Sequence, residues 1–291
     1  MIISKIQGGL GNQMFQYAIG RAYAEKLKTN LCLDLSFYSQ PFEKNITPRE
    51  FELDLFNLKY IVAEESDLSK FHNRSYWYRL KRKLGMNVPI HYREGNDSNI
   101  LKGKKDIYLD GYWQSESFFK DFSDIINADF QFKKELNRKS EDIAAKIKSK
   151  GTSVSIHLRR GDYVSSTVTN AYHGVCDIEY YKKAVGYLKD RISDPYFFVF
   201  SDDVDWARAK FLPMFDNMEV VQGNEGDDSW QDMHLMSMCH HNIIANSSFS
   251  WWAAWLNNNR DKVVIAPQNW FATAELNKDI HQRIPAGWIL Y

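Results

Sequence analysis

Four residues near the middle of the chain, His157, Arg159, Arg160 and Asp162, have types and spacing that suit phosphate chemistry. A guanidinium presents a planar fork of donors to phosphate oxygens, and each charge-assisted hydrogen bond contributes roughly 1.5–3 kcal/mol. An imidazole beside it adds a further donor. The set therefore predicts a diphosphate site. In the alternative interpretation, Arg160 and Asp162 pair at a surface turn and His157 packs in the core.

A serine-rich stretch follows a predicted strand and opens a predicted helix. It comprises Ser247, Ser248, Phe249 and Ser250. Hydroxyl groups and free amides at the start of a helix form an anion site. Ordinary capping of a helix also favours serine, so both interpretations stay open.

A glycine-rich turn near the amino terminus contains Gly9, Gly11, Asn12 and Gln13. Its glycines permit close approach of a ligand to the backbone, and the two side-chain amides add hydrogen-bonding groups. The turn is not the dinucleotide fingerprint, because the third glycine of that motif would fall on Met14. A tight turn with a helix cap is the alternative.

The periodicity of the chain places these residues at the ends of strands. Polar and apolar residues alternate over 153–159, which predicts a strand with His157 and Arg159 on one face. Further strands are predicted at 1–7, 31–35, 107–109, 196–200, 218–221, 242–245 and 262–265. Helices are predicted from the glycine turn to about 29 and over 138–150, 178–192, 205–212, 229–240 and 251–257. Residues 51–60 indicate a strand or short helix, and the basic, aromatic segment 71–99 favours an amphipathic surface helix.

Strands that alternate with helices in this way predict an α/β fold with parallel sheets covered on both faces. Ligands of such sheets bind outside the carboxyl ends of the strands. We expect an N-terminal Rossmann-like domain over 1–150, a second over 151–270, and a tail over 271–291 that packs back on the N-terminal domain.

The composition is that of a globular protein, and 291 residues suffice for about two domains. The 37 basic residues balance 37 acidic ones, so nucleic acid is not expected as a partner. Three scattered cysteines fit a reducing compartment. Without an apolar run long enough for a signal peptide or a membrane span, we expect a cytoplasmic protein, at most peripheral to a membrane.

Three stretches taken together, Gly8 to Ala18, His157 to Tyr163 and Asn246 to Trp252, resemble the α-1,2-fucosyltransferases of glycosyltransferase family 11. The resemblance runs from near the first residue to about Asn269. It implies a GT-B fold, in which two Rossmann-like domains face a central cleft. The domain over 1–150 would lie on the acceptor side, and the domain over 151–270 would bind the donor, GDP-fucose. It also implies an inverting transfer of L-fucose from GDP-β-L-fucose to the 2-hydroxyl of a terminal galactose on an oligosaccharide, without a metal ion or cofactor.

The resemblance assigns roles to individual residues. Arg159 would lie on the donor diphosphate with His157 beside it, and Asn12 would lie near the transferred fucose. Asp232 would bind guanine, whose N1–H and N2–H₂ donors suit a carboxylate. The expected donor-binding residues are Gly9, Gly11, Asn12, Gln13, Asp232, Ser247, Ser248, Phe249 and Ser250. The expected catalytic residues are His157, Arg159 and Asp162, and the general base is left open.

Two alternatives are carried forward. Asp203 and Asp205 match the Asp-x-Asp pattern that holds a divalent ion in metal-dependent glycosyltransferases, although Asp205 also suits a helix cap. The chain could also be a fucosyltransferase of another linkage, or a noncatalytic protein that binds a nucleotide sugar or glycan on the same fold.

Overall fold

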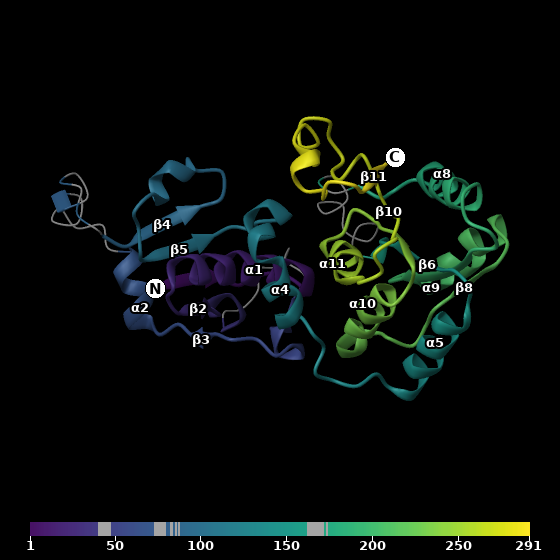
Figure 1. The fold of residues 1–291 in the computed structure, drawn as a ribbon, viewed down its shortest axis with the longest axis horizontal. Coiled ribbons are helices and arrows are strands. Elements are labelled where there is room, and N and C mark those ends of the chain that lie inside the picture. Colours follow the sequence, from purple (N-terminus) through teal and green to yellow (C-terminus); the bar gives the residue numbers. More distant parts are fainter. Residues whose placement is uncertain are drawn as a thin grey trace. The chain divides into compact units, whose positions relative to one another are not determined.

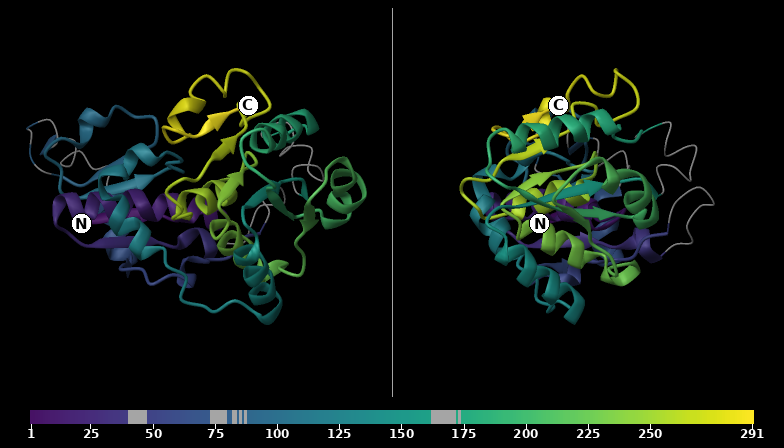
Figure 2. Two further views of the ribbon diagram at one scale, coloured as in Figure 1. Left: turned by 45° about the vertical axis from the view of Figure 1, so that its right-hand side comes forward. Right: turned by 90° about the vertical axis from the view of Figure 1, so that its right-hand side faces the viewer.

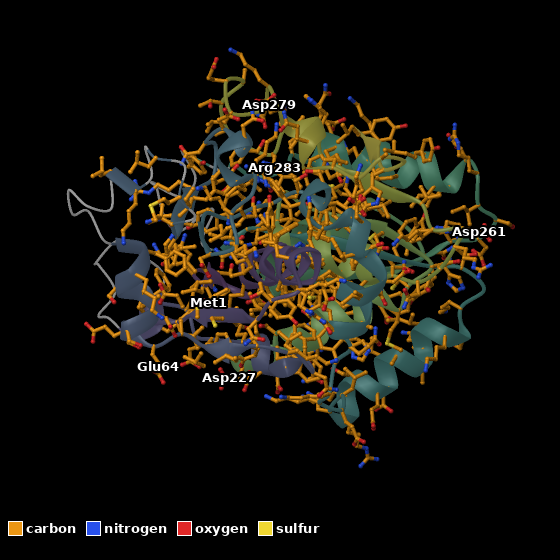
Figure 3. The ribbon with its side chains drawn as sticks, turned by 60° about the vertical axis from the view of Figure 1, so that its left-hand side comes forward. Met1, Glu64, Asp227, Asp261, Asp279 and Arg283 are labelled. Atoms are coloured by element: carbon orange, nitrogen blue, oxygen red, sulfur yellow. The ribbon has the colours of Figure 1, made fainter. Side chains whose placement is uncertain are left out.

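The computed structural model describes residues 1–39, 48–72, 80, 81, 84, 86, 88–161, 172 and 174–291. These residues form two compact units, Met1–Lys133 (unit 1) and Lys134–Tyr291 (unit 2), and Figure 1 traces the chain through both. Exposed acidic side chains such as Glu64, Asp227 and Asp261 project from them (Figure 3). Within the described ranges, no helix is long and apolar enough to cross a bilayer.

Unit 1 contains a five-stranded parallel sheet in the order β3-β2-β1-β5-β4. Its strands are β1 (Ile2–Lys5), β2 (Leu31–Asp34), β3 (Ile61–Val62), β4 (Ile90–Arg93) and β5 (Ile107–Asp110), and its α-helices are α1 (Leu10–Leu27), α2 (Glu65–His72) and α4 (Ser123–Asp129). Short 3₁₀ helices occupy Ser36–Ser39, Leu53–Leu55, Ser98–Leu101, Glu116–Phe118 and Lys120–Phe122.

The sheet of unit 1 is covered because its strands are apolar on both faces. Ile3, Cys32 and Tyr108 pack with Phe71 of α2 on one face. Helix α1 approaches the sheet closely at Gly20, where an added Cβ would lie 2.7 Å from a side-chain carbon of Leu31. Because all five strands are parallel, their carboxyl ends lie at the same end of the sheet.

Unit 2 contains a six-stranded parallel sheet in the order β11-β10-β9-β6-β7-β8. Its strands are β6 (Ser153–Leu158), β7 (Tyr196–Ser201), β8 (Met218–Val220), β9 (His241–Ile243), β10 (Val264–Ala266) and β11 (Ile289–Leu290). Its α-helices are α5 (Arg138–Ser149), α8 (Ile178–Lys189), α9 (Val204–Trp206), which continues as a π-helical turn over Ala207–Phe211, α10 (Trp230–Ser237) and α11 (Ser248–Leu256). Shorter 3₁₀ turns lie at Leu212–Met214, Gly226–Asp228 and Ile280–Gln282.

The central strand β6 is buried on both faces. Val154, Ile156 and Leu158 pack in the core formed with α8. The alternate residues, among them Ser155 and His157, belong to the face on which α10 and α11 pack together. The order of these strands is that of the dinucleotide-binding fold, 3-2-1-4-5-6 when counted from β6. The expected α/β fold with parallel sheets is confirmed in both units, and unit 2 has the Rossmann strand order.

The structure divides the chain earlier than residue 150. Helix α5 belongs to unit 2, because the backbone N–H of Asn137 donates to Gln231 Oε1 (2.8 Å) and Ser140 Oγ donates to Asn224 Oδ1 (3.0 Å). The expectation that α5 closes the N-terminal domain is wrong.

The C-terminal tail, expected over 271–291 as a separate segment, belongs to unit 2. There β11 extends the sheet next to β10, and the indole of Trp251 donates to the carbonyl of Arg283 (2.9 Å). Figure 2 shows this yellow segment beside the strands of unit 2, and Figure 3 labels Arg283 and Asp279 within it. The tail is therefore part of the second α/β domain.

Other differences concern short strands at the edges of the sheets. Strand β4 lies within the segment for which an amphipathic helix is expected, and much of the rest of that segment lies outside the described residues. The two-residue strands β3 and β11 carry too few residues for a recognisable alternation.

Candidate functional site

The strand order of unit 2 fixes where a ligand would bind. Strands β6 and β9 are neighbours in the sheet, although β7 and β8 intervene in the sequence. In open α/β sheets, the crevice outside the carboxyl ends at such a reversal is the usual ligand site. The end of β6 leads to Arg159, and β9 leads through Asn246 into α11.

His157 is buried at this position, with 5% of its surface exposed. Its ring lies 5.9 Å from that of Phe249, measured between centroids. Its Nδ1 atom is buried and has no hydrogen-bond partner within the described part of the chain. Burial lowers the pKa of His157, Asp202 opposes that shift and Arg159 adds to it. The imidazole is therefore neutral at pH 7 and retains a nitrogen for a ligand.

Arg159 is held by a carboxylate that directly follows the neighbouring strand β7. Its Nη1 lies 2.7 Å from Asp202 Oδ2, and Asp202 Oδ1 accepts the backbone N–H groups of Arg160 (2.8 Å) and Gly161 (3.0 Å). Asp202 thus organises the first residues after β6, Arg159 to Gly161. The predicted site does not include Asp202, although a carboxylate directly after a buried strand is a signal that the sequence offers.

Arg160 contacts Asp203 and Trp206, and the expected pairing with Asp162 stays a prediction. Its Nε lies 3.4 Å from Asp203 Oδ2, and its guanidinium lies over the ring of Trp206 at 3.7 Å. Asp162 lies outside the described residues.

The Asp-x-Asp pair has a structural explanation. Asp203 Oδ1 accepts the N–H of Trp206 (3.1 Å) and caps α9, so Asp203 is the cap and not Asp205. Across the described ranges, no three His, Cys, Asp or Glu side chains are grouped to hold a metal ion.

In the serine-rich stretch, some hydroxyl groups are used in hydrogen bonds at the start of α11, and others can bind a ligand. Ser247 Oγ accepts the N–H of Phe249 (3.3 Å) as the cap of α11, and Ser250 Oγ donates to the Ser247 carbonyl (3.4 Å). The capping interpretation therefore holds for Ser247, whereas the Ser250 hydroxyl is used in a hydrogen bond within the first turn. Ser248 is half-buried in the first turn beside Phe249, and its hydroxyl and amide are the groups that can meet an anion.

Asp232 lies in the first turn of α10 and is partly buried. Its Oδ1 accepts a hydrogen bond from Asn224 Nδ2 (2.8 Å). Burial raises the pKa of Asp232 to about 7, and the Asn224 hydrogen bond only partly offsets this. A half-satisfied, desolvated carboxylate is suited to bind paired N–H donors.

The glycine turn in unit 1 is more self-contained than expected. Gln13 is 0% exposed, its Nε2 donates to the carbonyls of Gly8 (2.9 Å) and Glu50 (2.7 Å), and its Oε1 accepts the N–H of Glu52 (2.9 Å). Both N–H groups of the Gln13 amide are thus used within the chain, so Gln13 holds the turn in place, and its expected contact with the donor stays a prediction.

The start of α1 is also occupied. The N–H of Leu10 donates to Glu52 Oε2 (3.0 Å), so a carboxylate from the chain itself sits where an anion would bind. Gly8 has φ +80°, a conformation that favours glycine. Gly9 is the cap of α1 and Gly11 lies in the first turn of that helix, whose start is closed by Glu52. Asn12 Oδ1 accepts a hydrogen bond from Gln114 Nε2 (2.6 Å), which joins the turn to the segment after β5.

Three relatives in sequence align with more than nine-tenths of this chain. The O-antigen biosynthesis glycosyltransferase WbnK of Escherichia coli is 36% identical over 92% of this chain and 94% of its own. An alpha-1,2-colitosyltransferase of Escherichia coli is 35% identical over 99% and 98%. The galactoside 2-alpha-L-fucosyltransferase Sec1 of Mus musculus is 25% identical over 91% and 67%.

Solved structures show the same fold at low sequence identity. The fucosyltransferase NodZ from Bradyrhizobium is 17% identical, with a TM-score of 0.52 over 87% of this chain and 90% of that one. A NodZ alpha-1,6-fucosyltransferase crystal soaked with GDP-fucose gives a TM-score of 0.51 at 17% identity, over 88% and 91%. The GT-B type of α/β fold is confirmed.

The family description "Glycosyl transferase family 11" matches residues 1–290, which is nearly the whole chain. Together with relatives above 30% identity along most of their length, this shows that the chain belongs to glycosyl transferase family 11.

Proposed function

We propose that this family 11 enzyme transfers L-fucose from GDP-β-L-fucose to the 2-hydroxyl of a terminal galactose, forming an α-1,2 linkage with inversion and without a metal ion. The observation that carries the proposal is the Arg159–Asp202 pair at the β6–β9 reversal. Beside it lies His157 Nδ1, which has no hydrogen-bond partner among the described residues. A guanidinium held in place there suits the diphosphate of a nucleotide sugar.

In the proposed reaction, the acceptor hydroxyl oxygen attacks the anomeric carbon of fucose. The bond from that carbon to the phosphate oxygen breaks, its electron pair leaves with GDP, and the hydroxyl proton passes to a base. Arg159 and the amide of Ser248 would stabilise the charge that grows on the leaving phosphate. Because the guanidinium is already oriented by Asp202, little reorganisation is needed as that charge develops.

Guanine recognition is proposed for Asp232. Its partly satisfied carboxylate offers acceptors for the N1–H and N2–H₂ groups of guanine, whereas adenine presents no such pair of donors. A carboxyl group with its pKa near 7 would be drawn into its ionised form by these donors.

GDP-colitose is a second candidate donor, because one relative is named an alpha-1,2-colitosyltransferase. Colitose is L-fucose without the 3-hydroxyl. A site that hydrogen-bonds this hydroxyl rejects the deoxy sugar by roughly 10⁴-fold or more, whereas an apolar site discriminates only weakly. The ratio of kcat/KM for GDP-fucose and GDP-colitose therefore decides which donor the site is built for.

The deciding experiment incubates the protein with GDP-fucose and lactose and follows GDP and the trisaccharide. NMR of the product should show an α-fucosyl residue on the galactose 2-position. Arg159→Ala should abolish product formation. Fucosylation at another hydroxyl would overturn the linkage, and GDP-fucose binding without any transfer to a panel of galactosides would favour a noncatalytic binding protein.

A further inference from the structure

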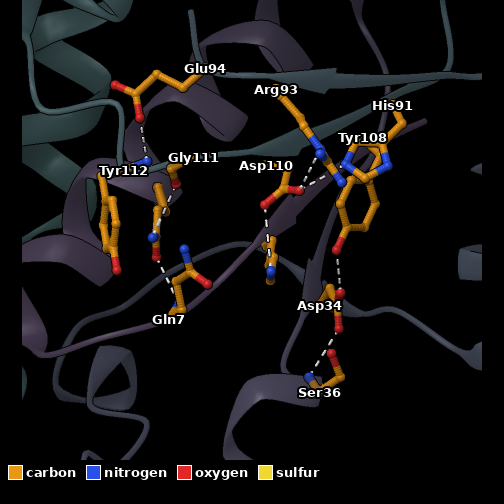
Figure 4. Close-up of polar contacts among 12 residues, drawn as sticks. Gln7, Asp34, Ser36, His91, Arg93, Glu94, Tyr108, Asp110, Gly111 and Tyr112 are labelled. Carbon is orange, nitrogen blue, oxygen red and sulfur yellow. Dashed lines mark hydrogen bonds and ion pairs between the residues drawn. The ribbon is translucent and has the colours of Figure 1, made fainter. Parts of the chain in front are cut away.

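The sheets of the two units are held in different ways at the carboxyl ends of their strands. In unit 1 a tyrosine links two strands through side chains, since the Tyr108 hydroxyl of β5 donates to Asp34 at the end of β2 (2.5 Å; Figure 4). In unit 2 two adjacent residues of α8, Tyr180 and Tyr181, donate to backbone carbonyls instead. We call Tyr180 and Tyr181 the tyrosine pair.

Tyr181 ends the hydrogen-bond ladder between β6 and β9. The pairing of these two strands stops at Ile156 and Ile243. One more rung of a parallel ladder would bring the N–H of Ala245 to the carbonyl of His157. That carbonyl is buried and instead accepts the hydroxyl of Tyr181 (2.9 Å). The two strands can therefore separate at the proposed donor site without leaving a buried carbonyl unpaired.

Tyr180 ends the ladder on the other side of β9. The N–H of Ile244 donates to the carbonyl of Ile265 (2.9 Å), so the next rung would need an N–H at residue 267. That residue is Pro267, which has no N–H to donate. The carbonyl of Ile244 accepts the Tyr180 hydroxyl at 2.6 Å, and the carbonyl of Ile265 lies 3.1 Å from the same hydroxyl oxygen. The proline thus explains why a donor from α8 is needed at this strand end.

The tyrosine pair is fixed firmly in the core of unit 2. Tyr180 is 6% exposed and Tyr181 is 3% exposed, and both pack with the apolar face of β6. Their rings meet edge to face with 4.8 Å between centroids, and Tyr181 makes a second such contact with Phe211 (5.4 Å). Burial raises the pKa of both hydroxyl groups, so both keep their protons and remain donors.

Each tyrosine holds the backbone behind one part of the proposed donor site. The His157 carbonyl lies two residues before Arg159, whose guanidinium pairs with Asp202 (2.7 Å). Ile244 directly follows β9 and lies four residues before Ser248, where α11 begins. A diphosphate in the crevice must fit between the end of β6 and the start of α11. The width of the crevice therefore depends on where the two ladders of β9 end.

We propose that the tyrosine pair positions the diphosphate-binding groups of the donor site. Tyr181 acts through the backbone that carries Arg159, and Tyr180 acts through the backbone that leads into α11. Both act without contact with the donor, by holding the strand ends apart before the ligand arrives, so that binding needs little reorganisation. The inference rests on the proposed function, because it assigns supporting residues to that donor site.

The test replaces each tyrosine by phenylalanine in the full chain, which keeps the ring and removes only the hydroxyl. Tyr187→Phe is the matched control, since Tyr187 lies on the same helix and its hydroxyl makes no hydrogen bond to the part of the chain that the structure describes. Calorimetry, well below the unfolding midpoint of each variant, measures the Kd for GDP and for guanosine. Tyr181→Phe and Tyr180→Phe should each raise the Kd for GDP at least fivefold. The Kd for guanosine should change less than twofold, because guanosine lacks the diphosphate.

A role in folding alone would lower the unfolding midpoint but change the two Kd values equally or not at all, and that result would overturn the inference. Coupling to Arg159 is a second measurement. In the Arg159→Lys background, Tyr181→Phe should have little further effect on the Kd for GDP, and strictly additive losses would contradict the proposed role of Tyr181. A wild-type protein that does not bind GDP would overturn the proposed donor site together with this inference. The expected losses of GDP binding in a protein that transfers no sugar would count against the proposed function alone.

Discussion

Arg159 Nη1 lies 2.7 Å from Asp202 Oδ2, so the cation at the end of β6 is fixed by a carboxylate at the end of β7. The register explains the contact, because Leu158 is paired with Ser201 and the next residues on the two strands are therefore neighbours. Asp202 also binds the N–H groups of Arg160 and Gly161. One carboxylate thus sets both the side chain and the backbone of the turn.

Replacing Asp202 by Asn should lower kcat/KM for GDP-fucose about 10- to 100-fold, a loss of roughly 1.4–2.7 kcal/mol of transition-state stabilisation. The Asn oxygen can still accept the two backbone N–H groups, but the side chain no longer attracts Arg159. Steady-state kinetics with varied GDP-fucose provides the measurement. Asp203→Asn is the control, since its carboxylate caps α9 and faces Arg160. Equal losses in the two variants would refute this role for Asp202.

Replacing Arg159 by Lys should cost more than a single hydrogen bond, at least tenfold in kcat, because a lysine keeps the charge but loses the planar fork. In the Arg159→Lys background, Asp202→Asn should then have little further effect, since the residue it positions is gone. A double-mutant cycle on kcat/KM measures this. Strictly additive losses would show that Asp202 acts independently of Arg159.

The main elements of this fold could be predicted because their patterns are long and regular. The alternation around His157 predicts the buried strand β6, and the helices that follow each strand predict parallel sheets. Arg159 could be placed at a strand end for the same reason. Strand β4, which lies in a basic and aromatic segment, could not, because four residues give little periodicity.

Side-chain partners were much harder to predict than elements. Gln13 lies in a glycine-rich turn, where a side-chain amide is typical of a ligand-binding residue. Its amide nevertheless donates to the carbonyls of Gly8 and Glu50, which folding brings near. Glu52, which closes the start of α1, lies 42 residues from its partner Leu10. Such long-range hydrogen bonds leave no local trace in the sequence.

Treatment with EDTA should leave transfer activity within about twofold of the untreated enzyme. In the proposed mechanism, Arg159 and the amides at the start of α11 carry the charge that a divalent ion would otherwise neutralise. Activity is measured before and after dialysis, with and without added manganese. Loss of nearly all activity after dialysis, restored by manganese, would show that the enzyme needs a metal ion. That result would overturn the proposal of metal-independent transfer.

Replacing Glu52 by Ala should destabilise the protein by about 1–2 kcal/mol, because Leu10 loses its partner at the start of α1 and Gly9 has no side chain to replace it. Thermal unfolding should show a midpoint lower by a few degrees. Glu50→Ala is the matched control, since the Glu50 contact to Gln13 uses only its backbone carbonyl. An unchanged midpoint in Glu52→Ala would mean that water replaces the carboxylate without cost.

The affinity for GDP should fall as the pH is lowered from 8 to 6. Burial raises the pKa of Asp232 to about 7, and a protonated carboxyl group must release its proton before it can accept both guanine donors. The Kd for GDP, measured by calorimetry, should rise up to about tenfold per pH unit below 7. Asp232→Asn should bind GDP weakly, with a Kd that depends less on pH. Asp228 is exposed, and the Asp228→Asn variant provides the control.

The raised pKa of Asp232 affects the stability of the free protein in the opposite direction: stability falls as the pH rises, whereas the affinity for GDP increases. The pKa of Asp232 is raised above its unfolded value near 4, so the folded state holds the extra proton between about pH 4 and 7. The stabilisation from that proton is complete below pH 4 and is lost as the pH rises through 7. Asp232→Asn should therefore gain stability relative to the wild type at pH 8 but not at pH 4, as measured by urea unfolding. A pH-independent difference between the two proteins would mean that Asp232 titrates normally, and guanine binding would then show no pH dependence from this residue.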